Sequence, residues 1–88
     1  MTTSRYVLPN PAGSPADAMT TAGWDPRFAT FWAQSYVGDE QTVFRYGISP
    51  REIPTLEELA ELLRTHGVTI PPEIARELGR DMWSEGSL

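Results

Sequence analysis

Aromatic side chains are concentrated in one short part of this 88-residue chain, and this concentration limits the folds open to it. Seven of the nine aromatic residues fall between positions 24 and 46: Trp24, Phe28, Phe31, Trp32, Tyr36, Phe44 and Tyr46. Residues 28–37 and 42–48 are rich in the aromatic and β-branched side chains that are typical of strands. Because the segment between them is short and polar, the sequence predicts an antiparallel β-hairpin.

The register of this hairpin decides which side chains share a face, and we pair Gly38 with Gln41. The face expected to form the core carries Phe31, Ala33, Ser35, Val37, Phe44, Tyr46 and Ile48. The opposite face mixes aromatic and polar side chains: Phe28, Thr30, Trp32, Gln34, Tyr36, Val43 and Arg45. A loop one residue longer or shorter would re-pair the second strand and change this partition.

Two helices are predicted after the hairpin. Prolines in residues 49–54 end the second strand, and the segment from Thr55 to Glu58 matches a capping box. The first helix should run to about Thr65, with Gly67 at the left-handed position that follows a helix. The second should begin at Pro71 and Pro72. Their apolar stripes at helical spacing are Leu56, Leu59, Ala60 and Leu63, and Ile74, Leu78 and Met82.

The N-terminal segment looks different, because residues 1–23 hold three of the eight prolines and many small side chains. Such a segment buries too little apolar surface to offset the entropy of ordering it. We therefore expect a flexible arm over residues 1–23, one small domain over 24–84 and a frayed tail over 85–88. The apolar triplet Tyr6-Val7-Leu8 is an exception that can dock on the domain or on a partner chain. The predicted fold class is α+β, a β-hairpin packed against two α-helices in the order ββαα.

Charge and cysteine content exclude several classes of protein. The chain has seven arginines, no lysine, twelve acidic residues and a net charge of −5, which weighs against binding to nucleic acid and to anionic lipid. It has no cysteine, so it has no disulfide framework, and a reducing, cytoplasmic location is expected. No apolar run approaches the ~18 residues that a membrane span needs, so no membrane association is predicted.

Candidate catalytic groups are few. His66 is the one histidine, and it falls in the last turn of the first helix, where a cation interacts favourably with the terminal carbonyls. Glu57 and Glu61 share a helix face, but that face lies opposite the leucine stripe and should be solvated. We predict no catalytic, cofactor or metal site and hence a non-enzymatic protein, with a catalytic His66 as the competing interpretation.

The aromatic hairpin is the predicted contact surface. Two helices can cover only one face of a two-stranded ribbon, and an isolated hairpin is only marginally stable in water. The uncovered face and the strand edges can be covered by Trp24 and the arm, by a second copy in a homodimer, or by a protein partner. The candidate interface residues are Trp24, Phe28, Trp32, Gln34, Tyr36, Val43 and Arg45.

Two alternative functions stay open. The acidic helices suit a regulatory or antitoxin-like subunit that binds a basic protein. Aromatic side chains on a sheet can also stack single-stranded bases, with Arg27, Arg45 and Arg51 nearby, although the acidic helices weigh against phosphate binding.

The segments Gly23-Trp24-Asp25-Pro26, Thr30-Phe31-Trp32-Ala33-Gln34 and Ser49-Pro50-Arg51-Glu52-Ile53-Pro54-Thr55 resemble small uncharacterised actinobacterial proteins. The resemblance covers residues 23–83 and implies a bacterial source and one compact domain, but no activity. The Gly23-Trp24 dipeptide is also similar to the MbtH-like family. That family's Ser-Leu-Trp-Pro and Thr-Asp-Met-Arg-Pro segments are missing here, so its functional residues are not carried over.

Overall fold

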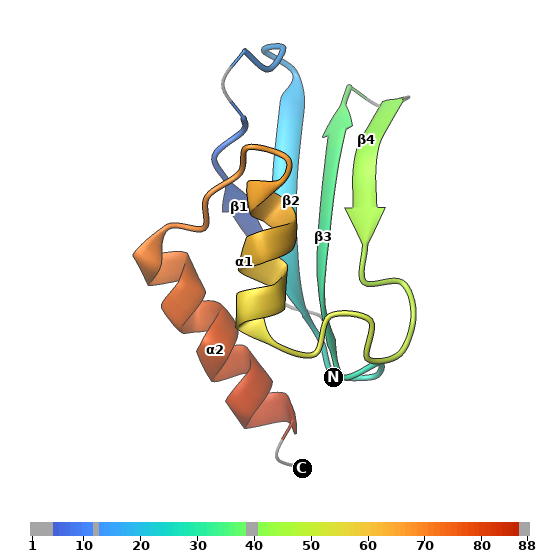
Figure 1. Cartoon of the computed structure of the whole chain (residues 1–88), viewed down its shortest axis with the longest axis vertical. Helices are drawn as coiled ribbons and strands as arrows, with labels where there is room; N and C mark the ends of the chain where they lie inside the picture. The colour runs from blue at the N-terminus through green and yellow to red at the C-terminus, as the bar shows by residue number, and fades with distance from the viewer. Residues whose placement is uncertain (1–4, 12, 39–40, 87–88) are drawn as a thin grey trace.

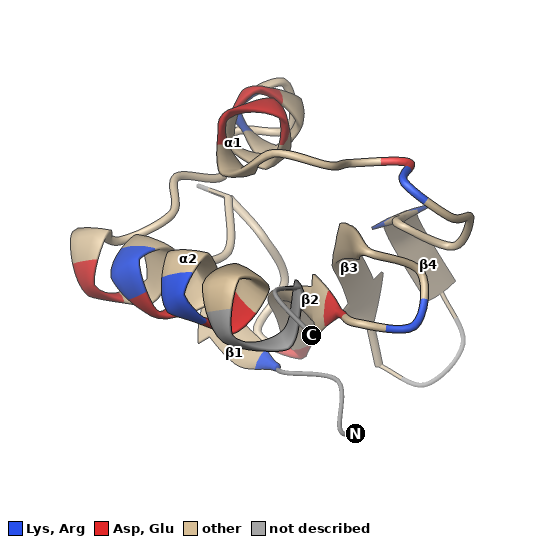
Figure 2. Cartoon of the chain, turned by 90° about the horizontal axis from the view of Figure 1, so that it is seen from below, with Lys and Arg blue, Asp and Glu red and all other residues tan. Residues whose placement is uncertain are grey.

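Four strands are followed by two helices in the computed structural model of the chain, which describes residues 5–11, 13–38 and 41–86. The elements are β1 (Tyr6–Leu8), β2 (Ala18–Asp25), β3 (Thr30–Val37), β4 (Gln41–Tyr46), α1 (Leu56–Arg64) and α2 (Pro72–Gly86). The strands form one antiparallel sheet in the order β1-β2-β3-β4 (Figure 1). Both helices lie on the same side of this sheet (Figure 2). The α+β class and the order of strands before helices are therefore confirmed.

Helix α1 begins and ends where its local sequence signals lie. The Thr55 hydroxyl accepts a hydrogen bond from the Glu58 amide at 3.2 Å, which satisfies one of the free donors of the first turn. After the last turn, Gly67 adopts a φ of +77°, and the Val68 amide donates to the Leu63 carbonyl at 3.0 Å. The capped helix predicted from Thr55 to about Thr65 is thus confirmed.

Helix α2 begins at Pro72, and the carbonyl of Pro71 accepts hydrogen bonds from the amides of Ile74 and Ala75. Leu78 is fully buried at the centre of its apolar stripe. The helix continues to Gly86, so the frayed tail predicted from residue 85 is corrected for residues 85 and 86. Residues 87 and 88 lie outside the described part of the chain.

The core lies between the helices and the sheet, because α1 packs on β3 and α2 packs on β2. The four largest side chains that are fully buried come from both layers: Phe31, Leu59, Leu63 and Leu78. Each such side chain contributes roughly 1.5–3 kcal/mol to the free energy of folding when it leaves water. The apolar stripes predicted for the two helices therefore face the core as expected.

The N-terminal segment is the main correction. Most of the predicted flexible arm over residues 1–23 belongs to the sheet, since it supplies β1 and most of β2. Thr20, Thr21 and Ala22 of β2 are fully buried. Ala18, Ala22 and Gly23 of this strand have weak strand preference, but β2 is hydrogen-bonded to a strand on each side and is packed against α2. Residues 1–4 of the predicted arm lie outside the described residues.

The register of β3 and β4 combines a confirmed part with a corrected part. Ser35 pairs with Phe44 and Gln34 pairs with Arg45, as the predicted register requires. Nearer the turn, however, Val37 rather than Gly38 pairs with Gln41, and Tyr36 pairs with Thr42. A bulge in β4 takes up the extra residue, Val43, between these two parts. The predicted turn residues 39 and 40 lie outside the described part of the chain.

The predicted core face of the hairpin is confirmed for Phe31, Ala33, Ser35 and Phe44, which are all buried. Ile48 is a correction, because β4 ends at Tyr46 and the Ile48 side chain is 59% exposed. Gly47, the residue directly after β4, has a φ of +84°, which turns the chain away from the sheet.

Candidate interaction surface

The helices cover one face of the sheet and leave the other uncovered. Strand pairing places Val7, Thr21, Gln34 and Arg45 in one row across all four strands. Because side chains alternate along a strand, this row lies on the face opposite the core residues Phe31, Ala33 and Ser35. We call this surface the open face and define it by six residues: Val7, Met19, Trp32, Gln34, Tyr36 and Arg45.

Apolar side chains are exposed at the β1, β2 and β4 positions of this surface. Val7 is 61% exposed and Met19 is 38% exposed, while Val43 in the bulge of β4 is 55% exposed. Tyr36 lies on β3 between the last two, where its hydroxyl accepts a hydrogen bond from Arg5 Nη2 at 3.1 Å and contacts Met19 Sδ at 3.2 Å. The polar tip of Tyr36 is thereby held within an otherwise apolar area.

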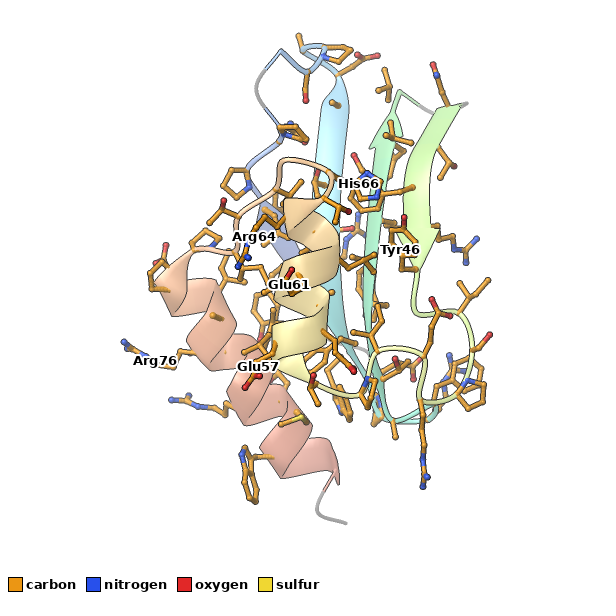
Figure 3. All side chains as sticks on the ribbon, viewed as in Figure 1. Tyr46, Glu57, Glu61, Arg64, His66 and Arg76 are labelled. Carbon is orange, nitrogen blue, oxygen red and sulfur yellow. The ribbon has the colours of Figure 1, made fainter. Side chains whose placement is uncertain are left out.

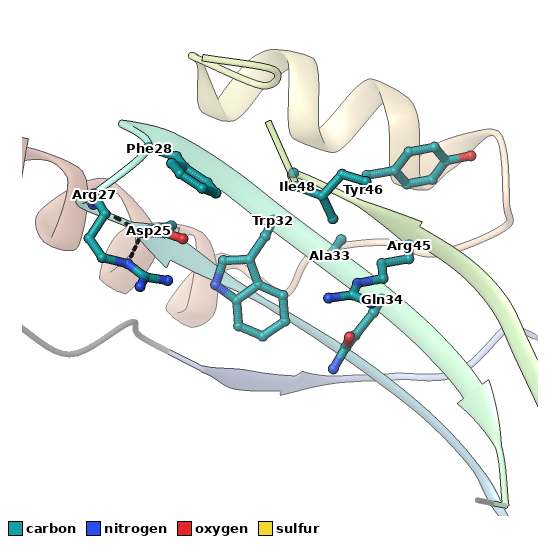
Figure 4. A pocket seen from close by; sticks show the side chains of 10 residues that line it. Asp25, Arg27, Phe28, Trp32, Ala33, Gln34, Arg45, Tyr46 and Ile48 are labelled. Carbon is teal, nitrogen blue, oxygen red and sulfur yellow. Dashed lines mark hydrogen bonds and ion pairs between the residues drawn. The ribbon is translucent and has the colours of Figure 1, made fainter. Parts of the chain in front are cut away.

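Trp32 lies nearer the other end of β3, opposite Gly23 of β2. Because Gly23 has no side chain, the neighbouring strand leaves room beside the indole ring. Trp32 is only partly buried, and its indole lines a groove of about 340 Å³. The other lining residues are Asp25, Arg27, Phe28, Ala33, Gln34, Arg45, Tyr46, Gly47 and Ile48 (Figure 4).

Charged groups lie at both ends of this groove. At one end, Asp25 accepts a hydrogen bond from the Arg27 amide at 3.0 Å, and its carboxylate lies 3.5 Å from Arg27 Nε. The Arg27 guanidinium also lies 5.7 Å from the centre of the Phe28 ring, within the range of a cation–π contact. At the other end, Arg45 and Gln34 lie side by side (Figure 4).

The Thr30 hydroxyl fixes the loop that precedes α1 against the start of β3. It accepts a hydrogen bond from the Ile53 amide at 2.7 Å and lies 3.2 Å from the Ile53 carbonyl oxygen. The Phe31 amide donates to the same carbonyl at 2.9 Å. The register places Thr30 on the same side of β3 as Trp32, as predicted, but Thr30 is fully buried, so this end of the face is not exposed.

The carboxylate of Glu52 holds the chain that leaves β4. It accepts hydrogen bonds from three successive backbone amides, those of Gly47 at 2.8 Å, Ile48 at 3.1 Å and Ser49 at 3.2 Å. These contacts close one wall of the groove, because Gly47 and Ile48 both line it. The groove is therefore formed by backbone that the protein itself holds in place.

The predicted interface residues divide into three groups. Trp24 is a correction, since it is 4% exposed and packs in the core with its ring 4.9 Å from that of Phe31. Val43 and Tyr36 lie in the apolar part of the surface. The remaining four line the groove: Phe28, Trp32, Gln34 and Arg45.

Sequence reasoning missed the surface residues that come from the N-terminal strands. The sequence prediction places Val7 and Met19 in the arm, although the Tyr6-Val7-Leu8 triplet is a usable signal. This triplet docks on the domain as β1. The arm therefore covers one edge of β3, which is part of one of the three predicted outcomes, and β4 is an edge strand. No helix or strand of the described residues lies over the open face.

His66 joins α1 to β4. Its Nε2 lies 2.8 Å from the Tyr46 hydroxyl, and its ring stacks on Phe44 with the centroids 4.4 Å apart. The side chain is half-buried, so it fills space between the layers instead of lying free at the end of the helix. The sequence-based expectation of a surface or capping histidine is corrected in this respect.

The acidic residues of α1 point away from the sheet. Glu57 and Glu61 are both exposed, and Figure 3 shows them on the outer side of the helix. Glu61 pairs with Arg64 at 3.0 Å, a surface ion pair of small energetic value. Within residues 5–11, 13–38 and 41–86, no three His, Asp or Glu side chains are close enough to hold a metal ion.

Comparison of the chain with protein-family models, with curated proteins and with solved structures gave no match. Neither of the two described helices has the length and apolar character that crossing a membrane requires. The functional inference therefore depends on the surface itself.

Proposed function

We propose that this chain is a small, non-enzymatic interaction protein that self-associates through the open face of its sheet. The observation that carries the proposal is the exposure of Val7 and Met19 beside the aromatic rings of Trp32 and Tyr36 on one uncovered face. Exposed apolar side chains that are contiguous with aromatic and arginine side chains are typical of protein interfaces. The absence of cysteine supports a reducing, cytoplasmic setting.

A second copy of the chain is the favoured partner. In a twofold dimer the same surface of both copies is in contact, so this surface must carry both members of every complementary pair of groups. The open face carries both the cation, Arg45, and the aromatic acceptors, Trp32 and Tyr36, at different positions on β3 and β4. A twofold axis through this face can thus place the guanidinium of one copy against a ring of the other.

The size of the face suggests how strong this association is. Strand β3 has eight residues, about 26 Å of chain, and four strands span about 19 Å, so the footprint is roughly 500 Å². A typical stable interface buries about 800 Å² on each partner. We therefore expect a dimer that forms at micromolar concentrations or above.

Stacking of faces is favoured over pairing of edges. The exposed edge of the sheet is β4, and its bulge at Val43 interrupts the regular backbone spacing that a second strand would need. The opposite edge, β1, has only three residues. Bulged and short edge strands are common protections against edge-to-edge association.

The alternative function is an antitoxin-like subunit that binds a basic protein through its acidic helix surface. The observation behind it is the exposure of Glu57, Glu58 and Glu61 on one helix. Binding of this kind would leave the open face free and would weaken steeply with added salt. Weak binding of single-stranded nucleic acid by Trp32 and Arg45 is a further alternative, and titration with mixed oligonucleotides at low salt tests it.

Light scattering after size exclusion at about 100 μM tests self-association. We expect a dimer mass for the native chain and a monomer mass for Val7→Glu, because a carboxylate would have to be desolvated in the interface. The matched control is Trp83→Glu on α2, which places the same charge at another exposed apolar residue (74% exposed) and should leave the dimer intact. Trp32→Ala should also weaken the dimer while circular dichroism shows a retained fold. A monomer mass for the native chain would refute the proposal.

A further inference from the structure

Met19 is the methionine that the open face exposes. The chain has three methionines, Met1, Met19 and Met82. Met19 is 38% exposed on β2, whereas Met82 of α2 is partly buried and packs against the core. Met1 lies outside the described residues. Oxidation of a thioether depends on access to its sulfur, so Met19 and Met82 should react with an oxidant at different rates.

The sulfur of Met19 lies at the surface in a defined position. The pairing of β1 with β2 ends at Leu8 and Thr20, so Met19 lies one residue beyond the last pair of these strands. On the side of β3, the Tyr36 hydroxyl donates to Met19 Sδ at 3.2 Å, and this contact is exposed. Arg5 Nη2 donates to the same hydroxyl at 3.1 Å, which leaves the phenol proton for the sulfur. A thioether sulfur has two lone pairs, and a single donor leaves one of them for an oxidant.

We propose that Met19 is a site of reversible oxidation that controls self-association through the open face. The regulation rests on the proposed function, because it acts on the same surface. The oxidant is hydrogen peroxide. A lone pair of the Met19 sulfur attacks one peroxide oxygen, and the S–O bond forms as the O–O bond breaks. The sulfur loses two electrons, the transferred oxygen stays as the sulfoxide, and the other oxygen leaves with both protons as water. Sulfoxide reductases reverse this change.

The sulfoxide alters the apolar part of the open face. Met19 lies there with Val7 and Val43, which are 61% and 55% exposed. The S–O group is a strong hydrogen-bond acceptor that must give up its water when two such faces stack. A twofold dimer contains Met19 twice, so this cost counts twice. We expect roughly tenfold weaker association for each oxidised copy, and so roughly a hundredfold weaker association for the pair.

The first measurement compares oxidation rates within one chain. The full chain is treated with dilute hydrogen peroxide well below micromolar concentration, where the expected dimer is dissociated. Trypsin cleaves after arginine and places the three methionines in separate peptides, residues 1–5, 6–27 and 81–88. Tandem mass spectrometry then locates the added oxygen on each residue. We expect Met19 to be oxidised several times faster than Met82, which is the internal control.

The second measurement is light scattering at about 100 μM before and after treatment. The oxidised chain should move toward the monomer mass with an unchanged circular dichroism spectrum. Methionine sulfoxide reductases with a thiol reductant should restore the dimer. Met19→Leu keeps an apolar side chain of similar size and should stay a dimer after treatment. The matched control, Met82→Leu, should respond as the native chain does. Met19→Gln places an amide at the same position and should weaken the dimer without any peroxide.

Oxidation of Met19 that is no faster than that of Met82 would overturn the proposal. So would a dimer that persists with Met19 fully oxidised, loss of the fold on oxidation, or dissociation of Met19→Leu to the same extent as the native chain. Each of these results leaves self-association itself intact. A native chain that is monomeric before treatment would instead refute the proposed function, and the regulation of it by Met19 as well.

Discussion

Replacing Gly47 by alanine should be the most damaging small change in this chain. A Cβ atom at position 47 would lie 2.5 Å from the Cα and 2.6 Å from the Cβ of Trp32, and it would meet the carbonyl oxygen of Phe31. These atoms belong to the middle of the sheet, so they cannot move without separating β3 from the chain that follows β4. Position 47 also has a φ of +84°, which side chains rarely adopt.

The magnitude follows from two separate costs. A left-handed backbone costs a residue with a Cβ atom roughly 1–2 kcal/mol. Inserting a carbon atom into a closely packed site costs roughly 1–3 kcal/mol more. The free energy of unfolding should therefore fall by about 2–5 kcal/mol. A chain of this length has roughly 4–13 kcal/mol in total, so the variant is expected to lose a large share of its stability.

Two other glycines separate these costs. Gly13 has almost the same φ, +83°, but a Cβ atom there would have no neighbour within 4 Å, so Gly13→Ala reports the backbone cost alone. Gly79 lies in α2 with equally free surroundings, and Gly79→Ala should stabilise the protein by up to about 1 kcal/mol. Urea denaturation followed by tryptophan fluorescence measures all three variants. If Gly47→Ala destabilises no more than Gly13→Ala, the steric reasoning fails.

Three further predictions concern single contacts. The Tyr6 hydroxyl donates to Asp81 at 2.6 Å, and this hydrogen bond, together with burial, raises the pKa of Tyr6 to about 12. The hydrogen bond is then fully present below pH 10 and is lost as the pH rises through 12. An ultraviolet titration should therefore show one phenol that ionises near pH 12, and Tyr6→Phe should remove this step. A step near pH 12 that remains in Tyr6→Phe would contradict the assignment. Thr30→Val should lower the free energy of unfolding by roughly 1–3 kcal/mol, because the Ile53 amide loses its acceptor. Thr30→Ser keeps the hydroxyl and should retain most of the native stability. Equal losses for the two variants in denaturant melts would contradict a stabilising role of the hydroxyl. Thr55→Ala should cost about 1 kcal/mol by removing the cap of α1, whereas Thr55→Asp should be nearly neutral in the same melts; a large loss in both would point to another role for the hydroxyl.

The elements with local signals could be predicted from the sequence. Helix α1 has a capping threonine, a leucine stripe and Gly67 within thirteen residues, so its ends are fixed by groups close in the chain. The pairing of Gln34 with Arg45 could also be predicted, because it depends on the alternation of buried and exposed side chains.

The first two strands could not be predicted in this way. β2 contains Ala18, Ala22 and Gly23, which are small residues with weak strand preference. Such a segment becomes a central strand only because its backbone pairs with β1 and β3 and its core-side residues lie under α2. The contact with α2 joins residues that are distant in the sequence, and no local pattern reports it.

The candidate site could be predicted only in part for the same reason. Trp32, Gln34, Tyr36 and Arg45 follow from the register of one hairpin. Trp24 is predicted for the contact surface because it precedes the two strands that the sequence predicts, whereas pairing of β2 with β3 turns its ring to the core beside Phe31. The apolar contribution of β1 and β2 depends on the same long-range pairing.

The contact between Tyr6 and Asp81 also has a consequence for the order in which a newly made chain folds. The two residues are 75 positions apart, yet the phenol of β1 rests on the carboxylate of α2. At a synthesis rate of roughly 5–20 residues per second, about 4–15 seconds pass between the synthesis of one partner and of the other. During this time β1 and β2 have no helix over them, and their apolar side chains remain open to chaperones and to neighbouring chains. Completion of the last helix therefore ends the period in which the first strands of the protein are most vulnerable.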